Sequence, residues 1–366
     1  MKHRHRAAIV CSLVWFLVCA ATIFVAPVDA APINGLYVFG DSLSDPGNNA
    51  IAMGSTASPP SSVTLRSDIT SNAFIPTYPY ATSYQYSNGN VWAYQFATML
   101  GLQSQVAGPV LGGGLGTNYA YGGAETGPVN NSGFPPSLLK QTAAFISALG
   151  SSPAPADALY VVAGGGNNAR DALTTIAGGA EPTATITATS LQFAADIGDI
   201  VDALQGKGAV NIAVWGVPNM GLAPAIAANG SSAAYLGTTL AQSMNSALGN
   251  RLASETGVQI FDMYSLVTAV NANPAAYGLS NASAAAGAIP GADLSQYLCW
   301  DGIHPTAAGH AILAQSMYAA VVPEPSSWVL LVAGLVPALV VVRHRWTRRS
   351  QRSRGHAVTR SSGHAI

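Results

Sequence analysis

The chain alternates between short apolar runs and longer segments in which apolar residues recur with a helical period. Runs of four to eight residues rich in Val, Ile, Phe, Tyr or Trp are typical of strands buried in a parallel sheet. Strand–helix alternation indicates an α/β fold with a mostly parallel sheet and helices on both of its faces. The predicted strands are Leu36–Phe39, Ala158–Ala163, Val210–Val217 and Val258–Met263. The predicted helices are Val91–Leu102, Ser137–Leu149, Ala188–Leu204, Ala233–Ser254 and Thr306 to about Ala320.

Two stretches of the chain show neither the apolar runs of strands nor the helical period. Residues 52–90 contain four prolines and four tyrosines, and a loop of this length is usually functional or disordered. Two interpretations stay open for it, a wall of a substrate site or a surface loop packed on the domain. Residues 268–293 are rich in alanine, asparagine and glycine and predict a second loop.

The first 30 residues have the pattern of a signal peptide. A basic cluster at residues 2–6 precedes an apolar stretch from Ala7 to Val25, and small residues follow at Val28 and Ala30. This pattern predicts export by the Sec route and cleavage after Ala30. An uncleaved N-terminal anchor is the alternative.

The C-terminal end of the chain has the pattern of a second targeting segment. A Pro-Glu-Pro sequence at residues 323–325 precedes an apolar stretch, Trp328–Val342, and an arginine-rich run that ends at residue 349. The 15 residues of this stretch are short for a spanning helix, which needs about 17–25. Residues 323–349 resemble the PEP-CTERM sorting signal of Gram-negative bacteria, which implies recognition by an exosortase and removal of the tail, including the basic residues 350–366. A plain C-terminal membrane anchor is the alternative, and both place the body outside the cytoplasm. The predicted location is the cell surface or the outside of the cell, after transient anchoring in the inner membrane by the C-terminal segment.

The net charge is much more negative for the body of the chain than for the whole sequence. Residues 31–322 hold five basic and 14 acidic residues, a net charge of −9, whereas the whole chain has a net charge of −1. Nucleic-acid binding depends on Lys and Arg, so this body is a poor candidate for it. Cys299 is the one cysteine of the body, which excludes an internal disulfide. About 290 residues are enough for one large domain with its own core.

The stretch FGDSLSDPGNN, residues 39–49, places Ser42 directly after the first predicted strand. Its residue types also dominate ordinary turns, so the stretch alone does not identify a nucleophile. A nucleophilic serine needs a base, and histidine is the usual one because its pKa lies near neutrality. The body offers only His304 and His310.

Asp301 lies three residues before His304. An acid at this distance can reach the histidine Nδ1 across a short turn, fix the tautomer and stabilise the imidazolium. The alternative is a polar turn at a helix start. His310 lies inside the last predicted helix, and we expect it to be partly buried or on the surface, without a direct role.

Acyl transfer also needs donors for the oxyanion of the tetrahedral intermediate. Gly164–Asn168 offers close backbone approach and a side-chain amide, and Asn118–Ala124 offers a glycine turn with N–H groups. Each is also consistent with an ordinary tight turn. No GxxxxGK[ST] sequence follows the glycines, and the body lacks a convincing set of zinc ligands, so we expect no metal or cofactor.

Four stretches in this order resemble the GDSL lipase/esterase family, part of the SGNH hydrolase superfamily. They are FGDSLSD at 39–45, NYAYGGA at 118–124, GNN at 166–168 and DGIHPT at 301–306. The resemblance covers nearly all of residues 35–320. It implies a three-layer α/β/α sandwich with a mostly parallel five-stranded sheet.

The resemblance also implies a role for each matching position. Ser42 is the nucleophile, and its backbone N–H, the Gly123 N–H and the Asn167 side-chain amide form the oxyanion hole. His304 is the base and Asp301 holds it. The implied protein is an exported serine esterase or lipase that hydrolyses carboxylic esters through an acyl-enzyme intermediate.

Some details of the resemblance stay open. Gly122 is adjacent to Gly123, and the alignment of this doublet is loose. Asn168 stands where the family often has Asp, which can alter how the preceding asparagine is held. Asp41 and Asp45 are interpreted as scaffolding of the turn rather than as catalytic acids.

Two other functions fit the same chain. A non-catalytic surface or extracellular-matrix protein would suit the sorting signal and the low-charge body. An acyltransferase or a polysaccharide deacetylase would use the same triad with another acceptor. The expected partners are an ester substrate, a lipid or an acylated glycan, and the exosortase machinery; we expect no nucleic acid, and membrane contact only through the C-terminal segment.

Overall fold

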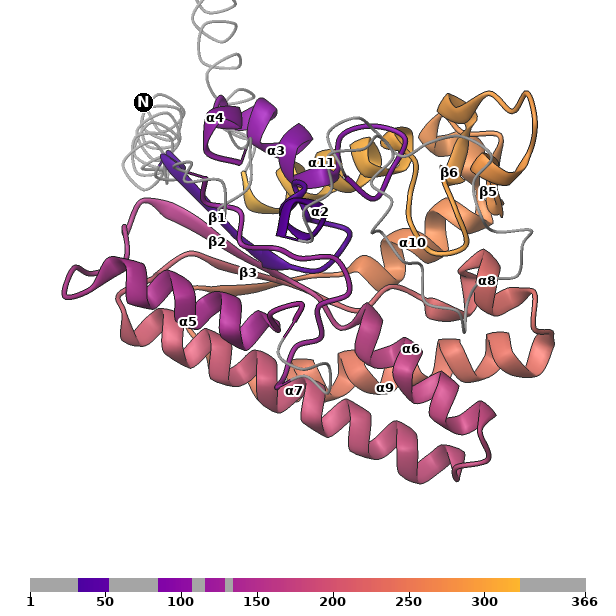
Figure 1. Ribbon diagram of the computed structural model, residues 1–366, viewed down its shortest axis with the longest axis horizontal. Helices are drawn as coiled ribbons and strands as arrows, with labels where there is room; N and C mark the ends of the chain where they lie inside the picture. The colour runs from indigo at the N-terminus through magenta and orange to yellow at the C-terminus, as the bar shows by residue number, and fades with distance from the viewer. Residues whose placement is uncertain (1–31, 53–84, 107–115, 129–133, 323–366) are drawn as a thin grey trace, which may run out of the picture. The chain divides into compact units, whose positions relative to one another are not determined.

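The computed structural model describes residues 32–52, 85–106, 116–128 and 134–322 (Figure 1). The predicted signal peptide, the PEP-CTERM-like segment and most of the long predicted loop at 52–90 lie outside these ranges. Within them, no helix combines the length and apolar character needed to cross a membrane.

The central sheet confirms the four strands predicted from apolar runs. All of its pairings are parallel, and the strands lie in the order β1-β2-β3-β4. Their carboxyl ends therefore meet at one edge, where Gly40 of β1 pairs with Ala163 of β2. The strands are β1 (Gly35–Gly40), β2 (Ala158–Ala163), β3 (Ile212–Trp215) and β4 (Val258–Phe261).

The sheet differs in one respect from the five strands that the resemblance implies. Beside β1, where a fifth strand would lie, the chain makes only an isolated parallel bridge between Val38 and Asn118. The Val38 N–H donates to the Thr117 carbonyl, and the Tyr119 N–H donates to the Val38 carbonyl. The Asn118 Oδ1 then accepts the Ala120 N–H at 3.0 Å, a local turn that interrupts regular pairing. The described residues therefore form a sheet of four strands with a fragment in the fifth position.

Helices cover both faces of the sheet (Figure 1). On one face lie α5 (Leu138–Leu149), α6 (Gly166–Ala177), α7 (Pro182–Gly206) and α9 (Ser231–Leu252). On the other lie α3 (Trp92–Leu100), α10 (Met263–Ala272) and α11 (Ala307–Val321).

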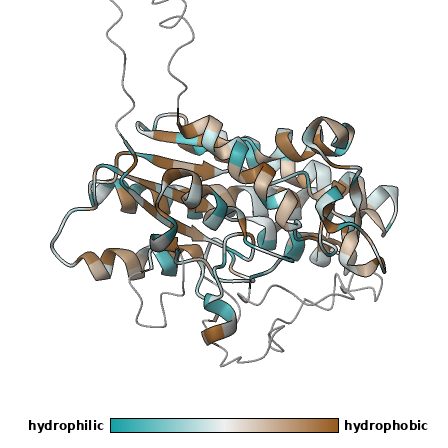
Figure 2. Cartoon of the chain, turned by 90° about the horizontal axis from the view of Figure 1, so that it is seen from above, coloured by the Kyte–Doolittle hydropathy of each residue, from teal (hydrophilic) through white to brown (hydrophobic). Residues whose placement is uncertain are grey.

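Alternation along the strands explains the two layers of helices. Tyr160 and Val162 of β2 pack with α5, α7 and α9, whereas Leu159 and Val161 pack with α3 and α11. Successive side chains of a strand point to opposite faces, so an entirely apolar strand fills two cores. Figure 2 shows the strands as hydrophobic ribbons between helices of mixed hydropathy. The predicted α/β/α sandwich is confirmed.

The predicted loop at 268–293 is partly wrong. Within it β5 (Asn281–Ala285) pairs in parallel with β6 (Tyr297–Cys299) in a separate two-stranded sheet. Helix α10 also continues as far as Ala272. The sequence NASAA of β5 has no β-branched or aromatic residue, so pairing with β6 rather than local propensity makes it a strand. The shorter helical elements are α2 (Asn48–Ala52), α4 (Gln103–Val106), η3 (Met220–Leu222), α8 (Pro224–Ala227), η4 (Pro274–Tyr277), η5 (Ala286–Ala288) and η6 (Leu294–Gln296).

His310 corrects a second expectation. It is completely buried on α11, where this helix packs on α3, and its Nδ1 accepts the Trp92 N–H at 3.1 Å. The histidine thus caps the start of α3 instead of lying near the surface. Burial, together with the charge of His304, lowers the pKa of His310 to about 3, so the ring is neutral at physiological pH.

Candidate active site

The predicted site residues come together at the carboxyl edge of the sheet. Ser42 follows β1 within two residues, and Asn167 lies in the first turn of α6, which begins three residues after β2 ends. Asp301 and His304 lie in the loop between β6 and α11. Ligands of open parallel sheets bind at this edge, as the sequence predicted.

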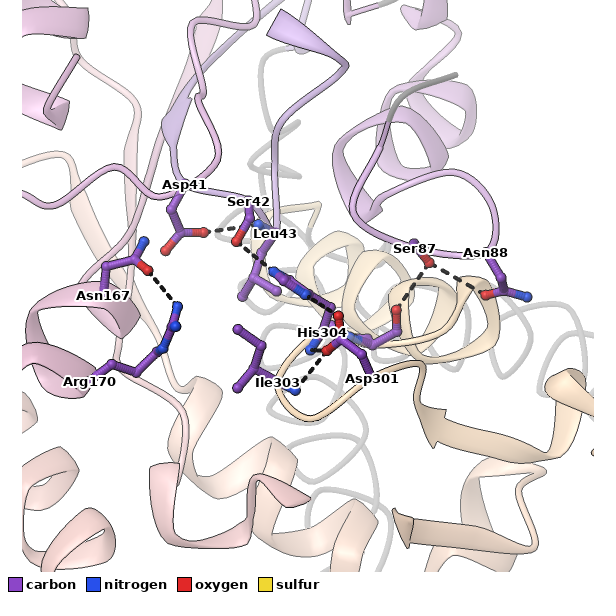
Figure 3. Close-up of polar contacts among 11 residues, drawn as sticks. Asp41, Ser42, Leu43, Ser87, Asn88, Asn167, Arg170, Asp301, Ile303 and His304 are labelled. Carbon is purple, nitrogen blue, oxygen red and sulfur yellow. Dashed lines mark hydrogen bonds and ion pairs between the residues drawn. The ribbon is translucent and has the colours of Figure 1, made fainter. Parts of the chain in front are cut away.

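Ser42, His304 and Asp301 form a continuous hydrogen-bonded row (Figure 3). The His304 Nε2 lies 2.9 Å from the Ser42 Oγ, and its Nδ1 lies 2.7 Å from Asp301 Oδ2. The serine is 8% exposed, the histidine 3% and the aspartate 1%. Only the serine end of the row therefore reaches the surface of the site, which suits attack on a bound carbonyl.

The local turn holds the Asp301 carboxylate in place. Its Oδ1 accepts the backbone N–H groups of Ile303 at 2.8 Å and His304 at 2.7 Å. Burial acts to raise the pKa of Asp301, but the charge of His304 and these hydrogen bonds outweigh it and leave the pKa below its ordinary value. The Tyr86 ring lies against the imidazole, with the ring centroids 5.3 Å apart. The carboxylate is thus ionised and aimed at Nδ1.

The backbone that presents Ser42 is clamped from α5. The Gln141 Oε1 accepts the Gly40 N–H at 2.8 Å, and its Nε2 donates to the Gly40 carbonyl at 2.9 Å. At Gly40 a Cβ would lie 2.8 Å from the carbonyl oxygen of Ala163. A glycine is therefore needed here, and the Gly40 carbonyl accepts the Tyr121 N–H at 3.1 Å as well as the amide of Gln141.

Asp45 determines which of the two glycines in the NYAYGGA stretch has an available N–H. Its Oδ2 accepts the Gly122 N–H at 2.8 Å, and its carboxylate also accepts N–H groups from the turn at residues 47–49. The Gly122 N–H is consequently occupied. Gly123 follows with a positive φ of 79°, and in the part of the chain that the structure describes its N–H makes no hydrogen bond. Gly123 remains as the available donor, together with the Ser42 N–H.

Asn167 is held at both ends of its amide. Its Nδ2 donates to the Ala124 carbonyl at 2.8 Å, and its Oδ1 accepts from Arg170 Nη1 at 3.0 Å. A guanidinium carries only donors, so it must face the amide oxygen, and the NH₂ group must turn the other way. Figure 3 shows the Arg170 side chain reaching the oxygen of this amide. One hydrogen of the Asn167 NH₂ group is left for a ligand.

Asn168 does not take part in holding its neighbour. Its Oδ1 accepts the Thr126 N–H at 3.2 Å and so ties α6 to the segment that contains Gly123. Asp41, which was predicted to support the turn, accepts the Leu43 N–H of that turn with its Oδ1 at 3.0 Å. Burial raises the pKa of Asp41 to about 6, although this N–H and the charges of His304 and Arg170 act in the opposite direction.

Two contributors were not predicted from the sequence. Arg170 is one of five basic residues in the body and follows Asn167 by three positions, a spacing that brings side chains into contact on a helix. This spacing is informative only if residues 166–177 are known to form a helix, which was not predicted from the sequence. Gln141 carries no sequence signal, because its partner Gly40 is 101 residues away. Among the described residues no group of three or more His, Cys, Asp or Glu side chains could hold a metal ion.

A three-layer α/β/α fold with a buried serine–histidine–aspartate row at the carboxyl edge of its sheet has the architecture of a serine hydrolase. Residues 36–317 match the family described as GDSL-like lipase/acylhydrolase, and the chain belongs to this family. Such a family membership indicates a hydrolase that acts on esters.

The chain is also similar to a GDSL esterase/lipase of Arabidopsis thaliana. The two share 29% identity over 147 residues, which cover 33% of this chain and 40% of the plant protein. The similarity therefore spans less than half of the length of that relative.

Proposed function

We propose that this protein is a serine esterase that hydrolyses carboxylic esters through an acyl-enzyme intermediate. The observation that carries the proposal is the row from Ser42 Oγ through His304 to Asp301, with hydrogen-bond distances of 2.9 and 2.7 Å. Serine is a weak nucleophile at neutral pH, and an adjacent base is what activates it.

The reaction proceeds in two halves. The His304 Nε2 takes the hydroxyl proton as Ser42 Oγ attacks the ester carbonyl, and the Asp301 carboxylate stabilises the imidazolium that forms. The imidazolium then protonates the departing alcohol and leaves an acyl-serine. A water molecule, deprotonated by the same Nε2, attacks this ester and releases the acid.

Three donors stabilise the oxyanion in both halves. They are the Ser42 N–H, the Gly123 N–H and the free hydrogen of the Asn167 amide, all without other acceptors in the described residues. Asp45 supports this assignment because it occupies the Gly122 N–H. Donors fixed in advance contribute more in a water-excluded site than they would in solution.

The test is hydrolysis of p-nitrophenyl butyrate by the purified full-length protein. We expect Ser42→Ala to lower kcat by at least about 10⁴, whereas Ser147→Ala, an exposed serine on α5, leaves it unchanged. A Ser42→Ala protein that retains the wild-type rate contradicts the mechanism. Absence of Ser42-dependent hydrolysis in the wild type would favour a non-catalytic surface protein, and transfer of the acyl group to an added alcohol or glycan would favour an acyltransferase.

Export and processing form the second half of the proposal. We infer that residues 1–30 direct the chain through the Sec route and that residues 323–349 are recognised and removed by an exosortase. The supporting features are the basic and apolar segments at both ends of the sequence. Mass spectrometry of the cell-surface protein is expected to find Ala31 at its start and no peptide from residues 323–366; a protein that retains both ends overturns this part.

A further inference from the structure

A small apolar cavity lies beside the Ser42–His304 pair. Its walls include Leu43, which follows Ser42 in the chain, and Ile303, which precedes His304. Figure 3 shows both of these side chains next to the His304 ring. The cavity has a volume of about 80 Å³. Its other walls come from the segment after β3 and from α10, β5, β6 and α11.

The walls divide into a mouth and a floor. Among the half-buried walls, Leu43 and Ile303 adjoin Ser42 and His304 in the chain, and Leu222 and Ala223 come from the segment after β3; these four residues are called the mouth. The floor consists of buried walls. A hydrogen bond of 3.0 Å from the Ala225 N–H to the Gly302 carbonyl holds the mouth against the loop that carries His304. The residues of the floor are Met263, Leu298, Cys299 and Leu313.

Hydrogen bonds within the protein occupy most of the polar groups of the side chains in the wall. The Asn219 amide is paired with the hydroxyls of Thr238 and Thr268, and the Asn271 Nδ2 donates to the Ala282 carbonyl. Burial, and after it the charge of Asp301, raises the pKa of the Cys299 thiol to about 12. The thiol is therefore neutral, and a neutral buried thiol acts as a small apolar group. An alkyl group fits such a cavity, whereas a hydroxylated group would lose its hydrogen bonds with water.

We propose that this cavity receives the alkyl part of the acyl group and limits the preferred substrates to short acyl esters, with butyryl the longest that fits. The proposal rests on the esterase function above. The cavity volume of about 80 Å³ is about half that of a cavity of roughly 150 Å³ that holds a benzene ring. It therefore has room for about half of the six ring carbons, which is about three carbon atoms.

A larger groove elsewhere is the competing place for an acyl chain. It has a volume of about 380 Å³ and lies between α6, α8 and α9, with Arg170, Leu173 and Leu236 among its lining residues. No residue adjacent to Ser42 or His304 in the chain contributes to it. The smaller cavity is therefore favoured, and a preference for long chains would point to the groove instead.

The first experiment compares p-nitrophenyl acetate, butyrate, hexanoate and octanoate on the full-length protein. The value of kcat/KM is expected to rise about fourfold with each methylene buried up to butyrate. From butyrate to octanoate it is expected to fall about tenfold or more, because the added carbons find no space. A value that rises steadily to octanoate overturns the proposal.

The second experiment reshapes the mouth. Leu222→Ala is expected to move the preferred chain from butyrate to hexanoate, and Ala223→Leu to lower kcat/KM for butyrate relative to acetate about tenfold. Leu191→Ala and Ala195→Leu, at exposed positions of α7, are the matched controls and leave the profile unchanged. An unaltered profile in both mouth variants overturns the cavity assignment.

The two proposals fail in different ways. A profile that peaks at long chains, in an enzyme that still depends on Ser42, overturns the short-acyl cavity and leaves the esterase function standing. Absence of any Ser42-dependent hydrolysis overturns the esterase function itself. The wild-type profile decides the question even where a mouth variant fails to fold.

Discussion

At the scale of single residues, the site depends on side chains that fix the direction of others. Arg170 never needs to touch a substrate, yet it determines which way the Asn167 amide faces. Asp45 similarly removes Gly122 from the set of available donors. The chemistry of the oxyanion hole is thus set by two charged residues that lie behind it.

Replacing Arg170 should disturb catalysis through Asn167. Arg170→Met removes the donor that holds the amide oxygen and leaves the amide held only by its bond to Ala124. We therefore expect kcat to fall about tenfold with little change in KM, less than the 10²–10³ expected for complete loss of an oxyanion donor. Arg170→Lys, which keeps a donor and the charge, should recover part of the rate. Steady-state kinetics of the single variants and of Arg170→Met combined with Asn167→Ala measure the coupling. A further tenfold loss in the double variant, relative to Asn167→Ala alone, would contradict this positioning role.

Asp301 offers a sharper test of the base. Asp301→Asn keeps the size of the side chain but presents an amide to the His304 Nδ1, which favours the wrong tautomer. We expect kcat to fall by about 10⁴, with the fold retained in circular dichroism. Asp171→Asn, at a half-buried position on α6, serves as the control. A kcat within tenfold of wild type would remove Asp301 from the mechanism.

The sequence named the three side chains that the structure brings into one hydrogen-bonded row, but not the residues that support them. Ser42, His304 and Asp301 were accessible because the body has two histidines and one of them follows an acid by three residues. Gln141 and Asp45 act on partners 101 and 77 residues away, and no local pattern encodes such pairs. His310 was placed wrongly because an alanine-rich helix gives little information about which face is buried.

At the scale of elements, α5 holds the end of β1 that leads into Ser42. The contact is a pair of hydrogen bonds from one side chain, Gln141, to the N–H and the carbonyl of Gly40. Helix α5 begins with Ser137 as its cap, whose hydroxyl accepts the Lys140 N–H at 3.4 Å. Position 141 is therefore fixed relative to the sheet from the first turn of the helix.

Gln141→Leu should test this clamp. The substitution leaves the buried Gly40 N–H without its Gln141 partner, which costs about 1–3 kcal/mol, whereas the Gly40 carbonyl keeps the Tyr121 N–H. We expect the free energy of unfolding to fall by about 1–3 kcal/mol in urea denaturation, and kcat to fall because Ser42 loses its support. Gln242→Leu, on the exposed side of α9, is the matched control. Equal stabilities of the two variants would show that the clamp contributes nothing.

Elements with strong apolar runs were predictable, whereas those defined by their neighbours were not. The four strands of the main sheet carry the runs that parallel strands need. Helix α6 begins with GNN, which is also typical of a turn, and its sequence was therefore not assigned as a helix. Strand β5 has no strand propensity and forms only because β6 lies beside it.

At the scale of the whole molecule, the acidic body carries buried carboxyls with opposite responses to pH. Burial raises the pKa of Asp41 and of Asp45 to about 6, whereas Asp301 has a lowered pKa. Groups with a raised pKa stabilise the folded state below their unfolded pKa and lose this contribution as the pH rises through the folded value. Asp301 acts in the opposite sense, and its contribution is lost only below about pH 4.

The free energy of unfolding should therefore decrease between about pH 4 and pH 6 through Asp41 and Asp45. For Asp41 the pKa shift of about two units corresponds to on the order of 3 kcal/mol. Asp41→Asn removes this titration, so urea denaturation at pH 4, 5, 6 and 7 is expected to give a flatter profile than in the wild type. Identical slopes for the two proteins would contradict the raised pKa.

Nucleophile and base are separated by 262 residues, with Ser42 after the first strand and His304 just before the last helix. At a synthesis rate of about 5–20 residues per second, the ribosome adds the histidine roughly 15–50 seconds after the serine. Throughout that interval the growing chain holds a serine that nothing activates. In the proposed mechanism the serine therefore has no base until residue 304 has been added, when nearly the whole body of the protein has already been synthesised.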